Sequence, residues 1–309
     1  MRILVLGAGG IGGYYGARIH AAGGDVTFLV RPARAEQLRK DGLKVSSPLG
    51  DLHVTPKVVT KEALKEPFDV IIVSCKAYDL GSAMESIAPV VGDQSVILPL
   101  LNGVAHVDTL VKRFGSERVL GGVALISVTL APNGEVHHLN KLHRFVTGSR
   151  TAQASRWLEP LAELLARSGF DFTLSANVEQ AMWDKIVFLT TLAGATCTLR
   201  ASVGTILDTV AGESFIKGLL AECARIAEAS GHALAEAQLT AFRNQLTEKG
   251  SALMASMLRD VEKGGPTEAD HILGDMVNRA QAKGVDAPLL RLAYSHLQAY
   301  DLRRKAAAG

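Results

Sequence analysis

The sequence predicts an α/β protein: a doubly wound sheet comes first, and an all-helical domain follows. Two observations carry this. A strand, a glycine-rich turn and a helix open the chain, and strand-like and helix-like segments then alternate as far as about residue 170. From about residue 177 onward only helical patterns remain. The 309 residues, 48% of them hydrophobic, suit two domains. We place these domains at 1–174 and 175–309, with a cleft between them.

The first half alternates short apolar runs with helical periods. RILVL at 2–6 and DVIIVSCK at 69–76 are bounded by turn residues, as expected of buried parallel strands. Further strands are predicted at 25–30, in short pieces within 44–59, and at 95–103, 119–130 and 143–149, with helices from the glycine turn to residue 22, at 80–91 and at 153–168.

The second half is predicted to be helical throughout. Its segments repeat apolar residues at helical spacing and are separated by short polar or glycine-containing connections. The predicted helices are 177–199, 212–231, 234–247, 250–263, 267–284 and 287–303.

Composition excludes several classes of function. The net charge is only +2 and aromatic residues make up 5%, so there is no basic face with exposed aromatics for a nucleic acid. The longest uncharged run, 186–199, is too short to span a membrane. The chain starts directly with a strand and has no signal-peptide pattern, which favours the cytoplasm. A homodimer is compatible with the helical half, although no long apolar stripe specifies one.

The spacing of the cysteines and histidines predicts no metal site. Cys75, Cys197 and Cys223 lie in apolar contexts without ligand spacing, so free thiols in a reducing compartment are expected. The histidines at 137, 138 and 143 have no acidic partner at ligand spacing and are interpreted as surface-loop residues.

A dinucleotide motif follows the first strand. Residues 7–12, GAGGIG, match G-x-G-x-x-G in the strand–turn–helix context that the motif requires. Gly7 permits the tight turn, Gly9 lets the backbone approach a pyrophosphate, and Gly12 lets helix and strand pack closely. Gly10 and Ile11 complete the turn at the helix N-terminus, where free N–H groups bind phosphates. A glycine turn without a ligand is the alternative.

The end of the second strand favours NADP(H) over NAD. An NAD site would place an acidic residue there, whereas this chain has Arg31, with Arg34 close behind. A guanidinium can bind a 2′-phosphate through two hydrogen bonds. A solvated loop arginine is the alternative, and it suits Arg34 better than Arg31.

Taken together, these pieces resemble the ketopantoate reductase family over nearly the whole chain. The resemblance rests on the glycine turn, Arg31, and the motifs VSCKAYD, LLNGV, MWDK, ASMLRD and PTEADHILG in this order. It implies an enzyme that reduces a 2-oxo acid with NADPH, with Lys185 as the proton donor. It also implies substrate contacts from Asn102, Lys185, Ser256 and Glu268. We further expect Lys76, Asn102 and Glu268 to contact the cofactor.

Elementary chemistry supports Lys185 independently of the resemblance. Asp184 and Lys185 are the only charges in the apolar stretch AMWDKIVFLTTLAGATCTL, so the amine must either reach solvent or face a polar site. Partial burial would lower its pKa toward the range useful for a general acid. The alternative is a lysine whose stem covers apolar surface at a domain edge.

Each of the other assignments has a structural alternative. Thr267 is a predicted N-cap, so Glu268 could simply complement a helix dipole. Ser256 could bond back to its own helix, and Asn102 could serve an Asn-Gly turn. Lys76 follows the C-terminal end of a strand, where ligands of such sheets bind.

One departure from the family bears on the substrate. Family members carry asparagines four and eight residues after the helix lysine, where this chain has Leu189 and Ala193. Thr190 and Thr191 lie off that face of the helix, and Ala269 replaces a usual isoleucine. Leucine cannot satisfy the hydroxyl that ketopantoate carries. Ketopantoate is the leading substrate, and a less hydroxylated 2-oxo acid or a non-catalytic NADPH sensor are the alternatives.

Overall fold

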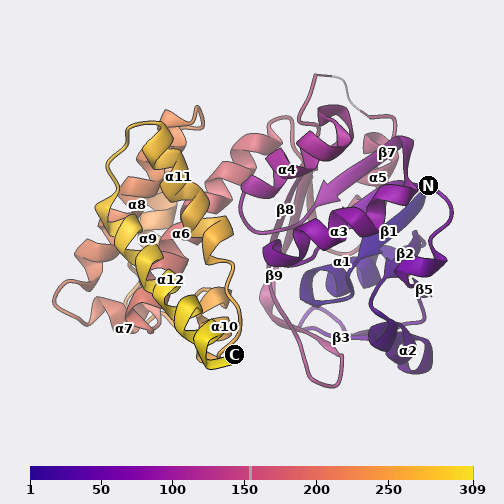
Figure 1. The fold of residues 1–309 in the computed structure, drawn as a ribbon, viewed down its shortest axis with the longest axis horizontal. Helices are drawn as coiled ribbons and strands as arrows, with labels where there is room; N and C mark the ends of the chain where they lie inside the picture. The colour runs from indigo at the N-terminus through magenta and orange to yellow at the C-terminus, as the bar shows by residue number, and fades with distance from the viewer. Residues whose placement is uncertain (153–154, 309) are drawn as a thin grey trace. The chain divides into compact units, whose positions relative to one another are not determined.

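The computed structural model describes residues 1–152 and 155–308, and it divides into two compact units (Figure 1). The first unit contains residues 1–101 and 106–181, and the second contains 102–105 and the chain from 182 onward. This division lies slightly later than the predicted boundary after residue 174, because the first turn of a long helix belongs to the first unit. The short segment 102–105 crosses over and becomes part of the helical unit.

The main sheet of the first unit is parallel throughout. Its strands lie in the order β5-β2-β1-β6-β7, so the strand order reverses between β1 and β6. Ligands of such sheets bind at the carboxyl ends of the strands beside this point. The predicted Rossmann-type sheet is therefore confirmed, with strands β1 (Arg2–Leu6), β2 (Asp25–Leu29), β5 (Lys57–Val59), β6 (Phe68–Val73) and β7 (Val91–Pro99).

A second, mixed sheet was not foreseen as a separate layer. Its order is β10-β9-β3-β4, and β8 pairs antiparallel with β9. The hairpin formed by β8 and β9 reverses at Ala131–Gly134, which keeps both strands together in one sheet. The strands are β3 (Leu43–Ser46), β4 (Leu52–Val54), β8 (Gly121–Leu130), β9 (Val136–Gly148) and β10 (Asp171–Leu174).

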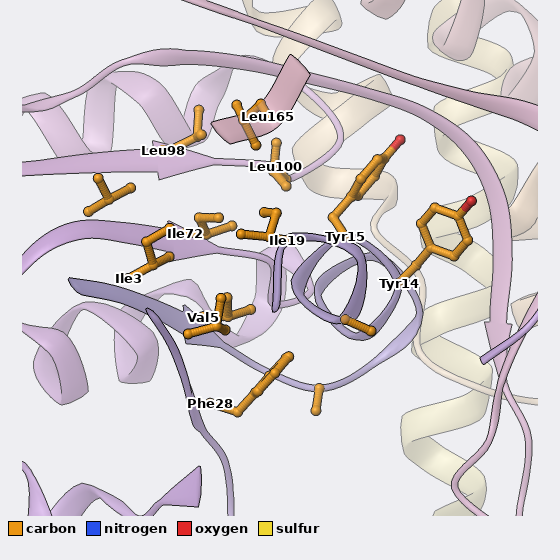
Figure 2. Packing of buried hydrophobic residues seen from close by; sticks show 14 of the residues in the cluster. Ile3, Val5, Tyr14, Tyr15, Ile19, Phe28, Ile72, Leu98, Leu100 and Leu165 are labelled. Carbon is orange, nitrogen blue, oxygen red and sulfur yellow. The ribbon is translucent and has the colours of Figure 1, made fainter. Parts of the chain in front are cut away.

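Helix α1 (Gly10–Ala21) is buried between the two sheets. It contacts β1 and β2 on one side and β3, β4, β8 and β9 on the other. The Tyr15 ring meets Phe145 and Phe170 edge-on, with centroids 4.9 and 5.1 Å away. Figure 2 shows Tyr15 and Ile19 of this helix among the buried side chains of the strands. This packing explains why a glycine-rich helix keeps a fixed position above the sheet.

The remaining helices of the first unit connect the strands. The predicted helix 80–91 is confirmed in a shorter form, and the one at 153–168 begins at 158 in the structure, while residues 153 and 154 lie outside the described part. Two helices of this unit, α2 and α4, were not predicted. The sequence of α2 is largely polar, whereas α4 is amphipathic and was overlooked. The helices are α2 (Pro32–Asp41), α3 (Leu80–Ile87), α4 (Ala105–Phe114) and α5 (Leu158–Ala166), with 3₁₀ turns at Lys61–Ala63, Ala77–Asp79, Ala88–Val90 and Ser116–Arg118.

The second unit contains helices and no strands among its described residues, as predicted. Helix α12 contacts α8, α11 and a π-helical turn. The predicted helix 250–263 is shorter in the structure, because residues 250–255 are not helical. The elements are α6 (Val178–Leu199), α7 (Val203–Leu207), α8 (Gly212–Ala229), α9 (Glu236–Leu246), α10 (Ser256–Glu262), the π-helical turn Asp270–Gly274, α11 (Asp275–Ala282) and α12 (Pro288–Ala308).

The three histidines lie in strand β9 and not in loops as predicted. His137 is partly exposed, and its Nε2 lies 3.4 Å from the carboxylate of Glu135. His138 and His143 are buried side chains of β9, not loop residues. Tyr14 Oη lies 2.8 Å from Nδ1 of His143, and Ser47 Oγ lies 2.9 Å from Nδ1 of His138. Hydroxyl partners take the place of the missing acidic ones, which explains how two imidazoles can be buried side by side.

The three cysteines form no disulfide bonds in the described residues. Cys75, Cys197 and Cys223 are free thiols, and burial raises the pKa of Cys197 and of Cys223 to about 12. Among the described helices, none combines the length and the apolar character needed to cross a bilayer.

Candidate active site

The glycine turn has the local geometry that its motif requires. Gly7 has a φ of +95° and donates its N–H to the Leu29 carbonyl at 2.9 Å, which ties the end of β1 to β2. A side chain at Gly12 would collide with the Gly7 carbonyl and with the side chain of Ser74. Ser74 is fixed by donating its hydroxyl to the Leu6 carbonyl at 2.9 Å. Glycine is therefore needed at both ends of the turn.

The surface beside Gly9 is open to a ligand. A side chain added at Gly9 would meet no atom of the described residues within 4 Å, and no side chain caps α1 there. The first N–H groups of α1 thus point to a place where a pyrophosphate can approach the backbone. Gly10 instead packs toward Val128, and Ile11 packs against the core. The residues present fit a dinucleotide.

Arg31 and Arg34 have different roles from each other. Arg31 occupies the N-cap position of α2 without a capping hydrogen bond from its side chain. This side chain is 83% exposed, and its guanidinium lies 3.3 Å from the carboxylate of Asp79. Arg34 is not a solvated loop residue: it is half-buried and donates to the Ala8 carbonyl at 3.0 Å inside the glycine turn. Burial lowers the pKa of its guanidinium. Arg34 therefore supports the turn, while Arg31 stays available for a ligand.

Lys185 and Asn102 come together in the second unit. The Nζ of Lys185 donates to Oδ1 of Asn102 at 3.0 Å, although the two residues are far apart in sequence. Asn102 belongs to the segment 102–105 after β7, which is why this segment clusters with the helices. Burial lowers the pKa of Lys185 to about 8, while the nearby carboxylate of Glu268 opposes that shift.

Glu268 lies in a buried, tightly held segment. Its side chain is 7% exposed, and its carbonyl accepts the N–H groups of His271 and Ile272, each at 3.1 Å. The predicted N-cap at Thr267 is wrong by at least one residue, because Glu268 is not yet helical and the π-helical turn has its N-cap at Ala269. The Thr267 hydroxyl instead accepts the N–H of Ala269 at 3.4 Å within the loop before the turn. A π-helical turn follows directly, and such turns are frequent at functional sites.

His271 was missed by the sequence analysis. A Cβ added at Gly103, whose φ is +96°, would lie only 2.7 Å from Cδ2 of the His271 ring. The Asn102–Gly103 segment therefore packs directly on the π-helical turn. Burial lowers the pKa of His271, against the effect of Glu268 and Asp275. No periodicity in the sequence marks a π-helical turn, so the position of this imidazole could not be read from it.

Two further predicted positions are Lys76 and Ser256. Lys76 is half-buried just after the C-terminal end of β6, in the first unit. Ser256 is exposed at the first position of α10, and within the described residues no hydrogen bond joins it to Lys185, Asn102 or Glu268. It is not an interior helix residue, so the back-bonding alternative does not apply to it.

The side chains that follow Lys185 on α6 offer few free hydrogen-bonding groups. Leu189 is half-buried and Ala193 is fully buried. Thr191 donates its hydroxyl to the Val187 carbonyl at 2.8 Å. The buried hydroxyl of Thr190 has no hydrogen-bond partner among the described residues.

Known proteins match nearly the whole chain. The family model for ketopantoate reductase PanE/ApbA matches residues 3–151, and the model for its C-terminal part matches residues 177–301. The chain is 36% identical to the uncharacterized oxidoreductase YkpB of Bacillus subtilis, over 98% of this chain and all of that protein. It is 27% identical to a 2-dehydropantoate 2-reductase of Halobacterium salinarum, over 94% of this chain and 96% of the relative.

Solved structures of similar proteins have the same fold as this chain. A 2-dehydropantoate 2-reductase of Geobacter metallireducens superposes with a TM-score of 0.88 at 29% identity, covering 96% of this chain and 99% of that one. D-mandelate dehydrogenase with NADH and anilino(oxo)acetate has the same TM-score at 21% identity, which shows a shared fold. The chain therefore belongs to the ketopantoate reductase family and is an oxidoreductase of the 2-dehydropantoate 2-reductase type, with a glycine turn and an Arg31 that are consistent with NADP(H) as its cofactor.

Proposed function

We propose that the protein reduces the carbonyl group of a 2-oxo acid to a hydroxyl group with NADPH. The observation that carries this proposal is the pair of Lys185 and Asn102, an amine with a pKa of about 8 held at 3.0 Å from an amide oxygen. An amine with such a pKa is still largely protonated at pH 7 and gives up its proton readily.

The proposed chemistry needs a hydride and a proton. When bound, NADPH supplies the hydride. Lys185 donates the proton to the carbonyl oxygen as negative charge develops there. Asn102 orients the ammonium, and Glu268 favours its charged form. The neutral lysine regains its proton from water before the next turnover.

The cofactor is proposed to bind mainly to the first unit. Backbone N–H groups of residues 7–12 would hold the pyrophosphate, and Arg31 the 2′-phosphate. Lys76, Asn102 and Glu268 remain proposed cofactor contacts. Ser256 remains a proposed ligand of the substrate carboxylate, and its exposure leaves its hydroxyl accessible.

The leading substrate is 2-dehydropantoate (ketopantoate), reduced to pantoate in pantothenate biosynthesis. A less hydroxylated 2-oxo acid is the second candidate. Leu189 offers no hydrogen bond, and the hydroxyl of Thr191 is already used by the Val187 carbonyl. A substrate hydroxyl left without a partner would cost about 1–3 kcal/mol. Thr190, whose buried hydroxyl has no described partner, is the remaining side chain that could serve it.

The cellular setting is also a proposal. Free, partly or fully buried thiols fit a reducing compartment, so we propose that the protein works in the cytoplasm. The homodimer stays a prediction.

Steady-state oxidation of NADPH tests this function against a panel of 2-oxo acids: ketopantoate, 2-oxoisovalerate, pyruvate and phenylglyoxylate. Ketopantoate should give the highest kcat/KM if the leading assignment holds. A higher value for one of the less hydroxylated acids would select the second candidate. Tight NADPH binding without oxidation by any acid would instead identify a non-catalytic sensor and overturn the proposal.

A further inference from the structure

Helix α12 holds the segment that carries Glu268 at two points. The Thr267 hydroxyl donates to Oδ2 of Asp301, and the Tyr294 hydroxyl donates to Oδ1 of Asp270 at 2.8 Å. Asp301 is itself paired with Arg304, whose Nε lies 3.3 Å from its other oxygen. The two bonds therefore fix the residues on either side of Glu268.

The ring of Tyr294 adds a packing contact to its hydrogen bond. A Cβ added at Gly274 would lie 2.8 Å from Tyr294 Oη and 2.9 Å from Cζ. The ring therefore lies directly against the last residue of the π-helical turn, where only glycine leaves it room. Tyr294 and Asp301 are seven residues apart, so they lie on one face of α12 about 10 Å apart along its axis. One rigid helix face thus holds both ends of the segment.

Glu268 lies between these two anchors. Its carboxylate is the charged group that opposes the effect of burial on the pKa of Lys185, and it acts in the same direction on the pKa of His271 in the π-helical turn. Lys185 is faced in addition by the amide oxygen of Asn102. A small movement of the segment would change how strongly Glu268 favours the ammonium form, because charge interactions in a partly buried site weaken with distance.

We infer that α12 positions Glu268 relative to Lys185, and that Tyr294 and Asp301 are the positioning residues. Neither is proposed to touch the substrate or the cofactor. The inference deepens the proposed function, because it explains how the proton donor is kept charged. It can nevertheless be tested without turnover.

The test measures the pKa of Lys185 directly. The amine is labelled with trace acetic anhydride between pH 6 and 10, and the labelled peptide is quantified by mass spectrometry. The variants are Tyr294→Phe, Thr267→Val and the two combined. With Glu268 less well placed, the pKa of Lys185 should fall by about 0.5 unit in the double variant, so labelling at pH 7 should be roughly threefold faster. Each single change should have a smaller effect.

Two controls separate positioning from stability. Thr147→Val removes a buried hydroxyl bond to the Gly121 carbonyl in the first unit, 2.7 Å long. It should lower Tm and leave Lys185 labelling unchanged. Thr267→Ser keeps the hydroxyl and should restore the wild-type value. If the double variant does not fold, Tyr294→Phe alone decides, because it removes a single oxygen atom.

The outcomes distinguish this inference from the proposed function. Wild-type labelling of Lys185 in folded Tyr294→Phe and double variants would overturn the positioning role, whatever the activity. If the labelling changes as expected but no 2-oxo acid is reduced, the proposed function fails and the positioning of Glu268 stands. If the proposed function and the positioning role are both correct, the alkaline limb of kcat/KM in the double variant should move to lower pH. The shift should equal that of the labelling curve.

Discussion

The glycine turn and the lysine site are built in opposite ways. The turn is contiguous, from Gly7 to Gly12, and its properties come from the backbone: a positive φ, a close approach, and free N–H groups. The lysine site combines side chains from α6, from the segment after β7 and from the segment before α11. In the proposed function the turn determines binding and the lysine site determines turnover. Substitutions in the two regions should therefore have separable effects.

The largest expected effect is the loss of turnover in Lys185→Ala. Removing a general acid should lower kcat by about 10²–10⁴-fold, since water must then supply the proton. The dissociation constant of NADPH, measured by fluorescence titration, should change by less than about threefold. A wild-type kcat in Lys185→Ala would contradict the claim that the lysine site determines turnover.

Gly12→Ala should have the converse effect. Even one methyl group at this position meets the Gly7 carbonyl and the side chain of Ser74, and overpacking of this kind costs about 1–3 kcal/mol. NADPH binding should weaken roughly 30-fold, with a lower Tm. Gly81→Ala is the matched control, because a Cβ there meets no described atom within 4 Å. Equal NADPH affinities in the two variants would contradict the role of the turn.

The pH dependence of stability tests the burial of Lys185. Its folded-state pKa of about 8 lies below the ordinary value of 10.5, so the unfolded chain binds more protons between these values. The contribution of this group to the free energy of unfolding should therefore rise by about 2 kcal/mol from pH 8 to 10.5. Denaturant titrations of the wild type and of Lys185→Met should show this difference. Parallel curves would mean that the amine is solvated.

The smallest expected effect concerns Arg31. The carboxylate of Asp79 lies 3.3 Å from the guanidinium of Arg31, so it would compete with the 2′-phosphate that Arg31 is proposed to bind. Exposed ion pairs contribute at most about 1 kcal/mol, so Asp79→Asn should tighten NADPH binding by about two- to fivefold. NADH binding should not change. If both cofactors respond equally, Arg31 does not select between them.

Local signals predicted the glycine turn, the alternation of strands and helices, and the helical second half. The residues 7–12 carry enough information by themselves, because the constraints at Gly7 and Gly12 arise within one strand–turn–helix unit and the neighbouring strand end. The resemblance supplied Lys185, Asn102 and Glu268 as site residues. Their contacts, however, depend on how remote segments fold back, and this could not be read from periodicity.

The misplaced residues have the same physical origin. The alternative of a solvated loop arginine is wrong for Arg34, because this residue lies in α2 and donates to the Ala8 carbonyl. His138 and His143 find hydroxyl partners on elements distant in sequence. The separate second sheet depends on hairpin pairing between β8 and β9, which the spacing of apolar runs did not reveal. In each case the position of the residue depends on a contact with a segment that is distant in the sequence.

The most direct test of the central claim is the pH profile of kcat/KM for wild type beside Lys185→Arg. Arginine keeps the positive charge but cannot release a proton near neutral pH. The wild type should lose activity as the pH rises through about 8, where Lys185 loses its proton, and the variant should be slow and show no limb there. An alkaline limb at the same pH in both proteins, with similar rates, would show that the proton comes from another group.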